Sequence, residues 1–313
     1  METSEAKRSR AESLEQTGCS EVQAPGRNED VRSRGAHEAV VEYTPFGQRG
    51  LVTWIEMIHE LYLARELTWR LFTRDFSARY RQSFLGYIWA VVPSLVMVAT
   101  FSWLHRTRIL PIGATVLPYP IFVLLGMTVW QLFSGGLTSA TQSLVSAGSI
   151  LTKINFPRET LVLAAFGQSL FEFLLRLVLL VGAFAVYRIV PAWTIVFLPV
   201  VVLPLCLLTI GLGYVCALIN AVFRDAGQIV TFVLTFWMFL TPVVYPSPPS
   251  SPHNLLNVIN PVSPFVIAAQ DLATRGSLSQ PGHFAIGCVT SLLIFLIGAR
   301  IFHVTEPRIA ERI

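Results

Sequence analysis

Six long apolar stretches, separated by short polar segments, constrain this chain more than any other feature. A membrane-spanning α-helix needs about 20 mostly apolar residues. The pattern predicts six such spans, at about residues 85–104, 117–136, 161–187, 195–221, 229–245 and 284–302. Charge is scarce there, since residues 85–313 carry 11 basic and 6 acidic side chains, whereas residues 1–84 carry 12 and 13. We therefore expect an all-α integral membrane protein with six transmembrane helices in a domain at 85–303, and we exclude a water-soluble enzyme, a nucleic-acid-binding domain and a disordered regulator.

The segments on either side of this domain are polar. Residues 1–50 have almost no aromatic side chains and cannot bury a core, so we expect a disordered cytoplasmic tail without the apolar segment of a signal peptide. Residues 51–84 place aromatic and Arg-rich faces at helical spacing, which predicts an amphipathic interfacial helix before the first span. A helix packed on another protein domain has the same pattern and is the alternative. Residues 304–313 are expected to form a second short cytoplasmic tail.

The distribution of Lys and Arg predicts the orientation of the chain. If the N-terminus is cytoplasmic, 11 basic residues near the ends of the spans lie inside the cell and 4 lie outside. The inner set is Arg65, Arg70, Arg74, Arg79, Arg81, Lys153, Arg158, Arg224, Arg300, Arg308 and Arg312, and the outer set is Arg106, Arg108, Arg188 and Arg275. Because cytoplasmic loops are enriched in Lys and Arg, we expect both termini in the cytoplasm.

The segment after the fifth predicted span is unusually rich in proline. Its apolar pieces, at 254–259 and 265–269, are too short to cross a bilayer. This pattern favours short helices within about 247–282 that lie at the outer membrane interface or dip into it. An ordinary extracellular loop is the alternative.

The chain has no motif for chemistry of its own. It lacks the G-x-x-x-x-G-K-[ST] phosphate loop, and its two lysines, Lys7 and Lys153, end no such loop. Its 4 cysteines and 6 histidines form no metal-binding pattern. We expect no catalytic residue, no metal and no cofactor on this chain. Six membrane helices without catalytic or nucleotide-binding motifs are typical of a transport protein. If its transport is active, the energy must come from a partner or an ion gradient.

Two charged residues lie deep in a predicted span. Glu172 and Arg176 are spaced i, i+4, so they can pair on one face of the third helix. A charge at the bilayer centre must face protein or water. We interpret the two residues as a buried structural ion pair, and a proton or substrate site is the alternative.

Three stretches of sequence resemble the permeases of ABC exporters for lipid-linked polysaccharides. Residues 74–90 (RDFSARYRQSFLGYIWA) are similar to the entry to their first membrane helix, and residues 153–159 (KINFPRE) resemble their loop between helices two and three. Residues 223–225 (FRD) and 236–246 (FWMFLTPVVYP), followed by Asn260 and Pro261, resemble the fifth helix and its flanks. The resemblance covers residues 50–303 in order, whereas the polar tail is longer than is usual in the family.

This resemblance implies a type-2 ABC permease of the kind that serves O-antigen, capsule or teichoic acid export. Such a permease is expected to form a homodimer and to bind a separate ABC ATPase, which holds ATP and Mg. It is expected to move a polyprenyl-diphosphate-linked glycan across the bacterial cytoplasmic (inner) membrane, as a multi-pass protein that contacts membrane lipid and no nucleic acid.

The inner loops are the candidates for receiving ATP-driven motion. The loop at 149–159 combines apolar and basic side chains, which predicts a compact knob that contacts the ATPase. Its residues are Ile150, Leu151, Lys153, Ile154, Asn155, Phe156, Pro157 and Arg158. Pro157 and Glu159 both favour the start of the next helix. The second inner loop contributes Arg224 and Asp225.

Two further groups are candidates for binding the cargo. Arg74, Arg79 and Arg81 precede the first span, and their guanidinium groups can bind the carrier's diphosphate bidentately; ordinary anchoring to the membrane surface is the alternative. The fifth helix carries aromatic side chains that can stack on sugars in a channel, namely Phe232, Phe236, Trp237 and Tyr245. We expect Trp237 and Tyr245 to be the best channel candidates, with helix packing as the alternative.

Three other functions compete with polysaccharide export. They are type-2 ABC export of a small drug or lipid, an integral-membrane glycosyltransferase and a proton-coupled carrier. A glycosyltransferase needs carboxylates clustered at one membrane face, and the 6 acidic residues of 85–313 are dispersed along the chain. A single mutually neutralised ion pair disfavours a proton-coupled carrier.

Overall fold

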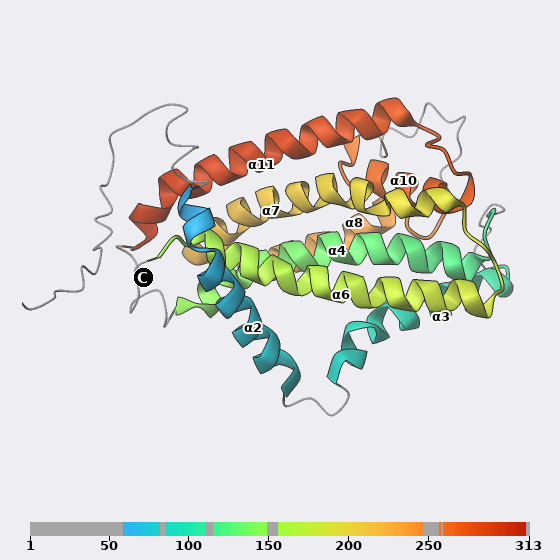
Figure 1. Ribbon diagram of the computed structural model, residues 1–313, viewed down its shortest axis with the longest axis horizontal. Helices are drawn as coiled ribbons and strands as arrows, with labels where there is room; N and C mark the ends of the chain where they lie inside the picture. Colours follow the sequence, from blue (N-terminus) through green and yellow to red (C-terminus); the bar gives the residue numbers. More distant parts are fainter. Residues whose placement is uncertain are drawn as a thin grey trace, which may run out of the picture. The chain divides into compact units, whose positions relative to one another are not determined.

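The computed structural model describes residues 59–81, 86–109, 115–148, 156–246, 257 and 259–310. All regular secondary structure within these residues is helical (Figure 1). The helices are α2 (Arg65–Arg81), η1 (Gly86–Ala90), α3 (Val92–Arg106), α4 (Tyr119–Ser146), α6 (Glu159–Val186), η2 (Trp193–Phe197), α7 (Leu198–Val222), α8 (Ala226–Leu240), α10 (Ser263–Thr274) and α11 (Pro281–Ala310). The predicted disordered tail at 1–50 lies outside the described residues.

Four helical segments are long and apolar enough to cross a membrane. They are Tyr119–Ser146, Glu159–Val186, Trp193–Val222 and Pro281–Thr305, and they correspond to four of the six predicted spans. The first and fifth predicted spans correspond to α3 and α8, which have 15 residues each. The all-helical membrane fold is therefore confirmed, whereas the number of six spans does not follow from helix length.

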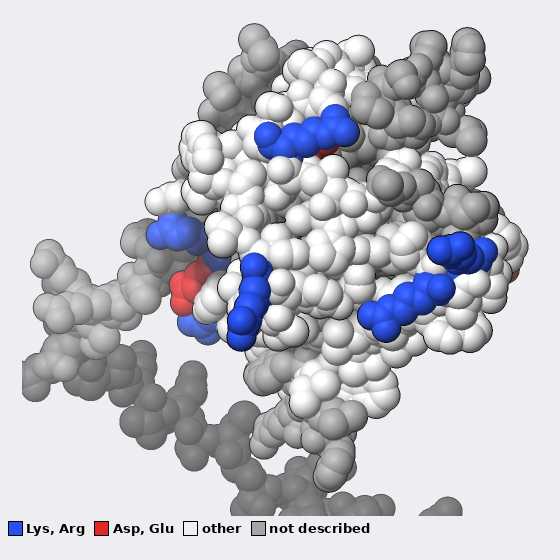
Figure 2. Space-filling model, turned by 90° about the vertical axis from the view of Figure 1, so that its right-hand side faces the viewer, with Lys and Arg blue, Asp and Glu red and all other residues white. Residues whose placement is uncertain are grey.

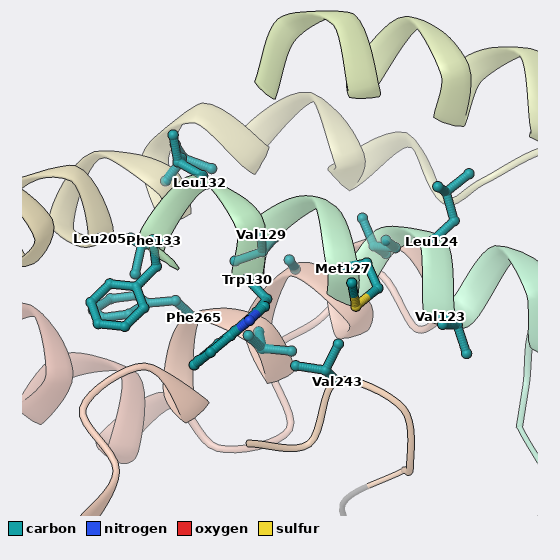
Figure 3. Close-up of a cluster of buried hydrophobic side chains, with 14 of the residues drawn as sticks. Val123, Leu124, Met127, Val129, Trp130, Leu132, Phe133, Leu205, Val243 and Phe265 are labelled. Atoms are coloured by element: carbon teal, nitrogen blue, oxygen red, sulfur yellow. The ribbon is translucent and has the colours of Figure 1, made fainter. Parts of the chain in front are cut away.

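The helix α4 lies at the centre and packs against α6 and α7 along its length (Figure 1). Its buried side chains include Val123, Met127, Trp130 and Phe133, which meet Leu205 of α7 and Phe265 of α10 in one hydrophobic cluster (Figure 3). This helix continues ten residues beyond the predicted end at 136, although the added segment is polar. Its hydroxyl groups donate to carbonyls of the same helix, for example Thr141 Oγ1 to Leu137 O at 2.7 Å, so they can be buried without further partners.

Small residues allow the central helices to approach closely. A Cβ atom added to Gly213 of α7 would lie 2.6 Å from the Cβ of Ala140 of α4. A Cβ atom added to Gly136 of α4 would lie 2.9 Å from the ring of Phe166 of α6. Glycine at these positions leaves room for the side chains of the neighbouring helix, as is usual for close helix packing in membranes.

The helix α2 packs against α6 through aromatic side chains. Phe72 covers Gly167 of α6, and Phe76 meets Phe171 edge to face with 4.6 Å between the ring centroids. Trp69 of α2 and Tyr62, just before it, are exposed. A helix is therefore present where the sequence predicts an amphipathic one, and residues 51–58 of that region lie outside the described residues.

The helix α10 occupies the region after the proline-rich segment. Residues Ser263 to Ala273 are all buried, and the helix packs against α4, α7, η2 and α11. A short helix is therefore present within the predicted range of 247–282, whereas its place at the outer membrane interface stays a prediction. Residues 247–256 lie outside the described residues.

Candidate functional site

The end of the bundle that holds Ser146, Glu159, Val222 and Ala226 is called the Glu159 end, and the opposite end is called the Tyr119 end. At the Glu159 end a separate hydrophobic cluster joins five helices. Its members include Leu71 of α2, Leu144 of α4, Leu161 of α6, Leu218 of α7 and Phe302 of α11. This cluster includes Phe156, and it lies at the same end of the bundle as the turn between α7 and α8.

Phe156 belongs to this cluster and does not form part of an exposed knob. Its side chain is only 8% exposed. Phe156 therefore packs against the bundle, which corrects its predicted place in an exposed knob, whereas contact of this loop with the ATPase stays a prediction. Pro157 and Arg158 follow it and are partly exposed. The other loop residues, Ile150, Leu151, Lys153, Ile154 and Asn155, lie outside the described residues.

Glu159 begins α6 and connects it to α11. Its side chain is 3% exposed, and its Oε1 atom lies 3.0 Å from Nδ1 of His303. The sequence predicts the position of Glu159 in the first turn of the helix, where the helix dipole favours a negative charge. It does not predict His303, because the two residues are 144 positions apart. The helix α11 continues past His303 to Ala310, so the residues after 303 begin as helix and not as the predicted tail.

The second predicted inner loop is exposed but firmly held. Arg224 and Asp225 are both exposed. Asn220, which precedes them, is buried and accepts a hydrogen bond from the backbone N–H of Gly227 at 2.8 Å. The loop is thus a tight turn between α7 and α8, and its two charged side chains can contact a partner.

Of the three arginines predicted to form a gate that binds the carrier's diphosphate, only Arg74 has a described side chain. Its Nη2 and Nε atoms lie 2.6 and 2.7 Å from Oδ1 of Asp75. An anion that binds Arg74 must therefore compete with the neighbouring carboxylate. Arg79 and Arg81 lie in the last turn of α2, and their side chains are outside the described part of the structure.

The four aromatic side chains predicted to line a channel divide between two environments. Phe232 and Phe236 are 65% and 58% exposed, and their ring centroids lie 4.8 Å apart. Trp237 packs edge to face on Phe133 and donates a hydrogen bond from Nε1 to Oδ1 of Asn260 at 3.0 Å. Tyr245 is partly buried against the core. The structure therefore places Trp237 and Tyr245 against the core, and Phe232 and Phe236 on the exposed face of α8.

Hydrogen bonds from several elements hold the segment that follows α8. The helix ends at Leu240 because Thr241 adopts an extended conformation before Pro242. Asn260 donates to Thr241 Oγ1 at 2.8 Å, Gln270 donates to the carbonyl of Pro242 at 3.2 Å, and the Tyr119 hydroxyl donates to the carbonyl of Val244 at 2.9 Å. The sequence identifies Asn260 only as part of a motif. The structure shows that its side chain connects Trp237 and Thr241 at the end of α8.

The predicted ion pair in α6 is formed. Nη2 of Arg176 lies 2.9 Å from Oε2 of Glu172, and their side chains are 5% and 17% exposed. Each charge is thus compensated within one turn of the same helix. Among the described residues there is no cluster of three or more side chains suited to hold a metal ion.

Comparison with known proteins places this geometry in context. The family model described as "ABC-2 type transporter" matches residues 66–272. The O-antigen export system permease protein RfbA of Myxococcus xanthus is 30% identical over 266 residues, which are 83% of this chain and 100% of that protein. A protein of the same name from Klebsiella pneumoniae is 25% identical over 260 residues, which are 82% of this chain and 98% of that protein.

Proposed function

The chain belongs to the ABC-2 type transporter family, and on this premise we propose that it is the permease of an exporter that moves a lipid-linked polysaccharide of the O-antigen type. It is a transport subunit and not an enzyme. The observation that carries the proposal is the relationship to the Myxococcus xanthus O-antigen permease, which extends over the whole length of that protein. Export of a small drug or lipid, and glycosyl transfer, are less well supported because the similar relatives are named as O-antigen permeases.

A separate ABC ATPase supplies the energy, and ATP and Mg are bound on that chain. The Glu159 end offers the surface for it, since Arg158 is partly exposed and Arg224 and Asp225 are exposed on a tight turn. The cluster that contains Phe156 connects this surface to five helices. A movement of the ATPase that displaces either loop is therefore transmitted to packed helices.

Six crossings of the membrane are consistent with the lengths of the shorter helices. The helices η1 and α3 together rise about 32 Å, close to the bilayer core of about 30 Å. The 15 residues of α8 rise only about 22 Å. The segment from Thr241 to Val244 extends this crossing, and it is buried with carbonyls of Pro242 and Val244 hydrogen-bonded. Non-helical backbone is tolerated at membrane depth when it is buried in protein in this way.

The Glu159 end faces the cytoplasm in this proposal, and the Tyr119 end faces outward. Seen from the Tyr119 end, the surface carries separated basic side chains on a mostly uncharged face (Figure 2). The exposed Tyr62 and Trp69 support α2 as an interfacial helix, because such side chains favour the headgroup region. The chain lies in the cytoplasmic membrane with both termini inside.

The functional unit is a homodimer with the glycan path between two copies. Phe232, Phe236 and Phe239 are exposed on one helix that is otherwise anchored in the core, so they are suited to line such a path. Flat aromatic faces bind sugars without selecting one sequence of sugars. The carrier's diphosphate meets the arginines of α2, where it displaces Asp75 from Arg74.

The direct test uses the permease and its cognate ATPase in a host strain that lacks its own O-antigen exporter but synthesises the lipid-linked glycan. We expect surface glycan to appear with the wild-type complex and lipid-linked glycan to accumulate inside the cell without it. A matched ATPase variant that binds but does not hydrolyse ATP serves as the control. Proteoliposomes that transport small lipids but no lipid-linked glycan would contradict the proposal.

A further inference from the structure

Asn220, near the end of α7, connects three helices through one buried side chain. It is 4% exposed. Its Nδ2 donates to the backbone carbonyl of Thr141 in α4 at 2.9 Å, and its Oδ1 accepts from the backbone N–H of Gly227 in α8 at 2.8 Å. An amide side chain supplies both a donor and an acceptor, so Asn satisfies the two contacts at once.

The contact with Gly227 provides an acceptor for an N–H group that has no partner within α8. Gly227 is the second residue of this helix, and the first four N–H groups of a helix have no partner within it. Asp225 makes no side-chain capping hydrogen bond, so Asn220 from the preceding helix provides the acceptor. A Cβ atom added to Gly227 would lie 3.1 Å from Oδ1 of Asn220, and glycine therefore permits this short approach.

The amide joins two parts of the chain with different proposed tasks. Thr141 lies five residues before Ser146, where α4 ends. The predicted coupling loop begins at residue 149, shortly after this helix in the sequence. Gly227 begins the helix that exposes Phe232 and Phe236. From Gln228 to Val233 no side chain of α8 is fully buried, whereas Leu234 and Met238 are core residues. The first half of α8 is thus held at its start, by the buried Ala226 and Gly227 and the Asn220 amide, and beyond that only by the partly buried Val230 before the core residue Leu234.

We propose that Asn220 is a positioning residue for energy coupling: it ties the start of α8 to α4, so that displacement at the end of α4 moves the aromatic face of α8. This inference rests on the proposed function for the meaning of that movement. The physical reason is that two backbone-directed hydrogen bonds from one buried side chain fix the relative position of three helices, whereas an apolar contact permits sliding.

The test is amide hydrogen exchange of the complex with its ABC ATPase, with and without ATP. In the wild-type complex we expect ATP to change exchange both at residues 141–148 and at residues 226–233. Asn220→Asp keeps an acceptor for Gly227 but loses the donor to Thr141. We expect the response to ATP at 141–148 to remain and the response at 226–233 to be lost, because the bond to α4 is gone while Gly227 keeps its acceptor.

Two controls separate this role from simple stabilisation. Asn260→Asp places the same change in a buried Asn at the other end of α8, and both ATP responses should persist. Gly227→Ala strains the other hydrogen bond of the Asn220 amide, the one from the Gly227 N–H, without adding charge, and it should also weaken the ATP response at 226–233 even if Asn220→Asp folds poorly. Gly182→Ala, where an added Cβ meets nothing within 4 Å, should behave as wild type.

The proposal is overturned if residues 226–233 do not respond to ATP in the wild-type complex, if Asn220→Asp retains their response, or if Asn260→Asp loses it equally. None of these outcomes depends on the cargo. Failure to export a glycan, with the exchange pattern intact, would instead contradict the proposed function alone.

Discussion

Gly211 of α7 and Gly298 of α11 meet with their backbones in direct contact. A Cβ atom added to Gly298 would lie 2.9 Å from the carbonyl carbon of Gly211, and one added to Gly211 would lie 2.6 Å from Cα of Phe295. The two helices therefore cross at a point where no side chain fits between them. Because lipid tails are as apolar as leucine, this close packing is what holds such helices together.

We predict that Gly298→Val separates α7 from α11. The added side chain has no space, and overpacking of this kind costs about 1–3 kcal/mol of stability. The thermal unfolding midpoint of the purified protein in detergent should fall, together with the yield of folded protein. Gly182→Val, at a position with open space around it, is the matched control and should leave both unchanged. Equal behaviour of the two variants would argue against the crossing.

The ion pair of Glu172 and Arg176 should support folding and not coupling. Glu172→Gln removes the carboxylate that lies 2.9 Å from Arg176, and breaking a buried ion pair costs about 3–5 kcal/mol when water is excluded. The amount of folded protein should fall, and Glu172→Gln combined with Arg176→Met should recover part of it. Normal expression of Glu172→Gln with no transport would instead identify a functional site.

Phe156→Ala should destabilise the permease and not merely weaken its contact with the ATPase. Truncation of a buried phenylalanine typically costs about 3–5 kcal/mol because a cavity remains. The unfolding midpoint of the permease alone reports this loss. Arg224→Ala is the comparison, since its side chain is exposed: we expect normal stability and weaker co-purification of the ATPase. A stable Phe156→Ala protein that fails to bind the ATPase would restore the docking role.

If the arginines of α2 bind the diphosphate, glycan export should depend on their guanidinium groups and not on positive charge alone. Arg79→Lys and Arg74→Lys keep the positive charge but lose the bidentate fork, so recognition of a diphosphate should weaken clearly. Glycan export at equal permease abundance is the measurement. Asp75→Asn releases Arg74 from its carboxylate partner and should not reduce export. Near-normal export by both lysine variants would support simple anchoring to the membrane surface.

The proposed orientation predicts opposite accessibility for two exposed positions. Val190→Cys, between α6 and α7, should react with an impermeant thiol reagent from outside the cell, because it lies at the Tyr119 end. Phe223→Cys, at the Glu159 end, should react only after the membrane is opened. All four native cysteines are replaced in the background protein. Labelling of both positions in intact cells would overturn the orientation.

Local patterns in the sequence predict the fold class, one ion pair and the family of this protein. The length of the apolar stretches predicts the helical membrane fold, the i, i+4 spacing of Glu172 and Arg176 predicts their contact, and ordered motifs indicate the family. These properties depend on residues that are neighbours in the chain. For the same reason the sequence predicts α6 within two residues at its start and one at its end.

The tertiary structure alone decided which side of each apolar helix meets protein. Both surroundings are apolar in a membrane, so hydrophobicity does not distinguish a side chain that faces lipid or a channel from one that faces the core. This is why the sequence predicts Trp237 in a channel, whereas it is found in a packing position. Phe156 lies in a loop, and only the folded chain shows that its side chain is buried in the cluster at the Glu159 end. The contacts of Glu159 with His303 and of Asn220 with Thr141 join residues 144 and 79 positions apart, and only the path of the folded chain brings them together.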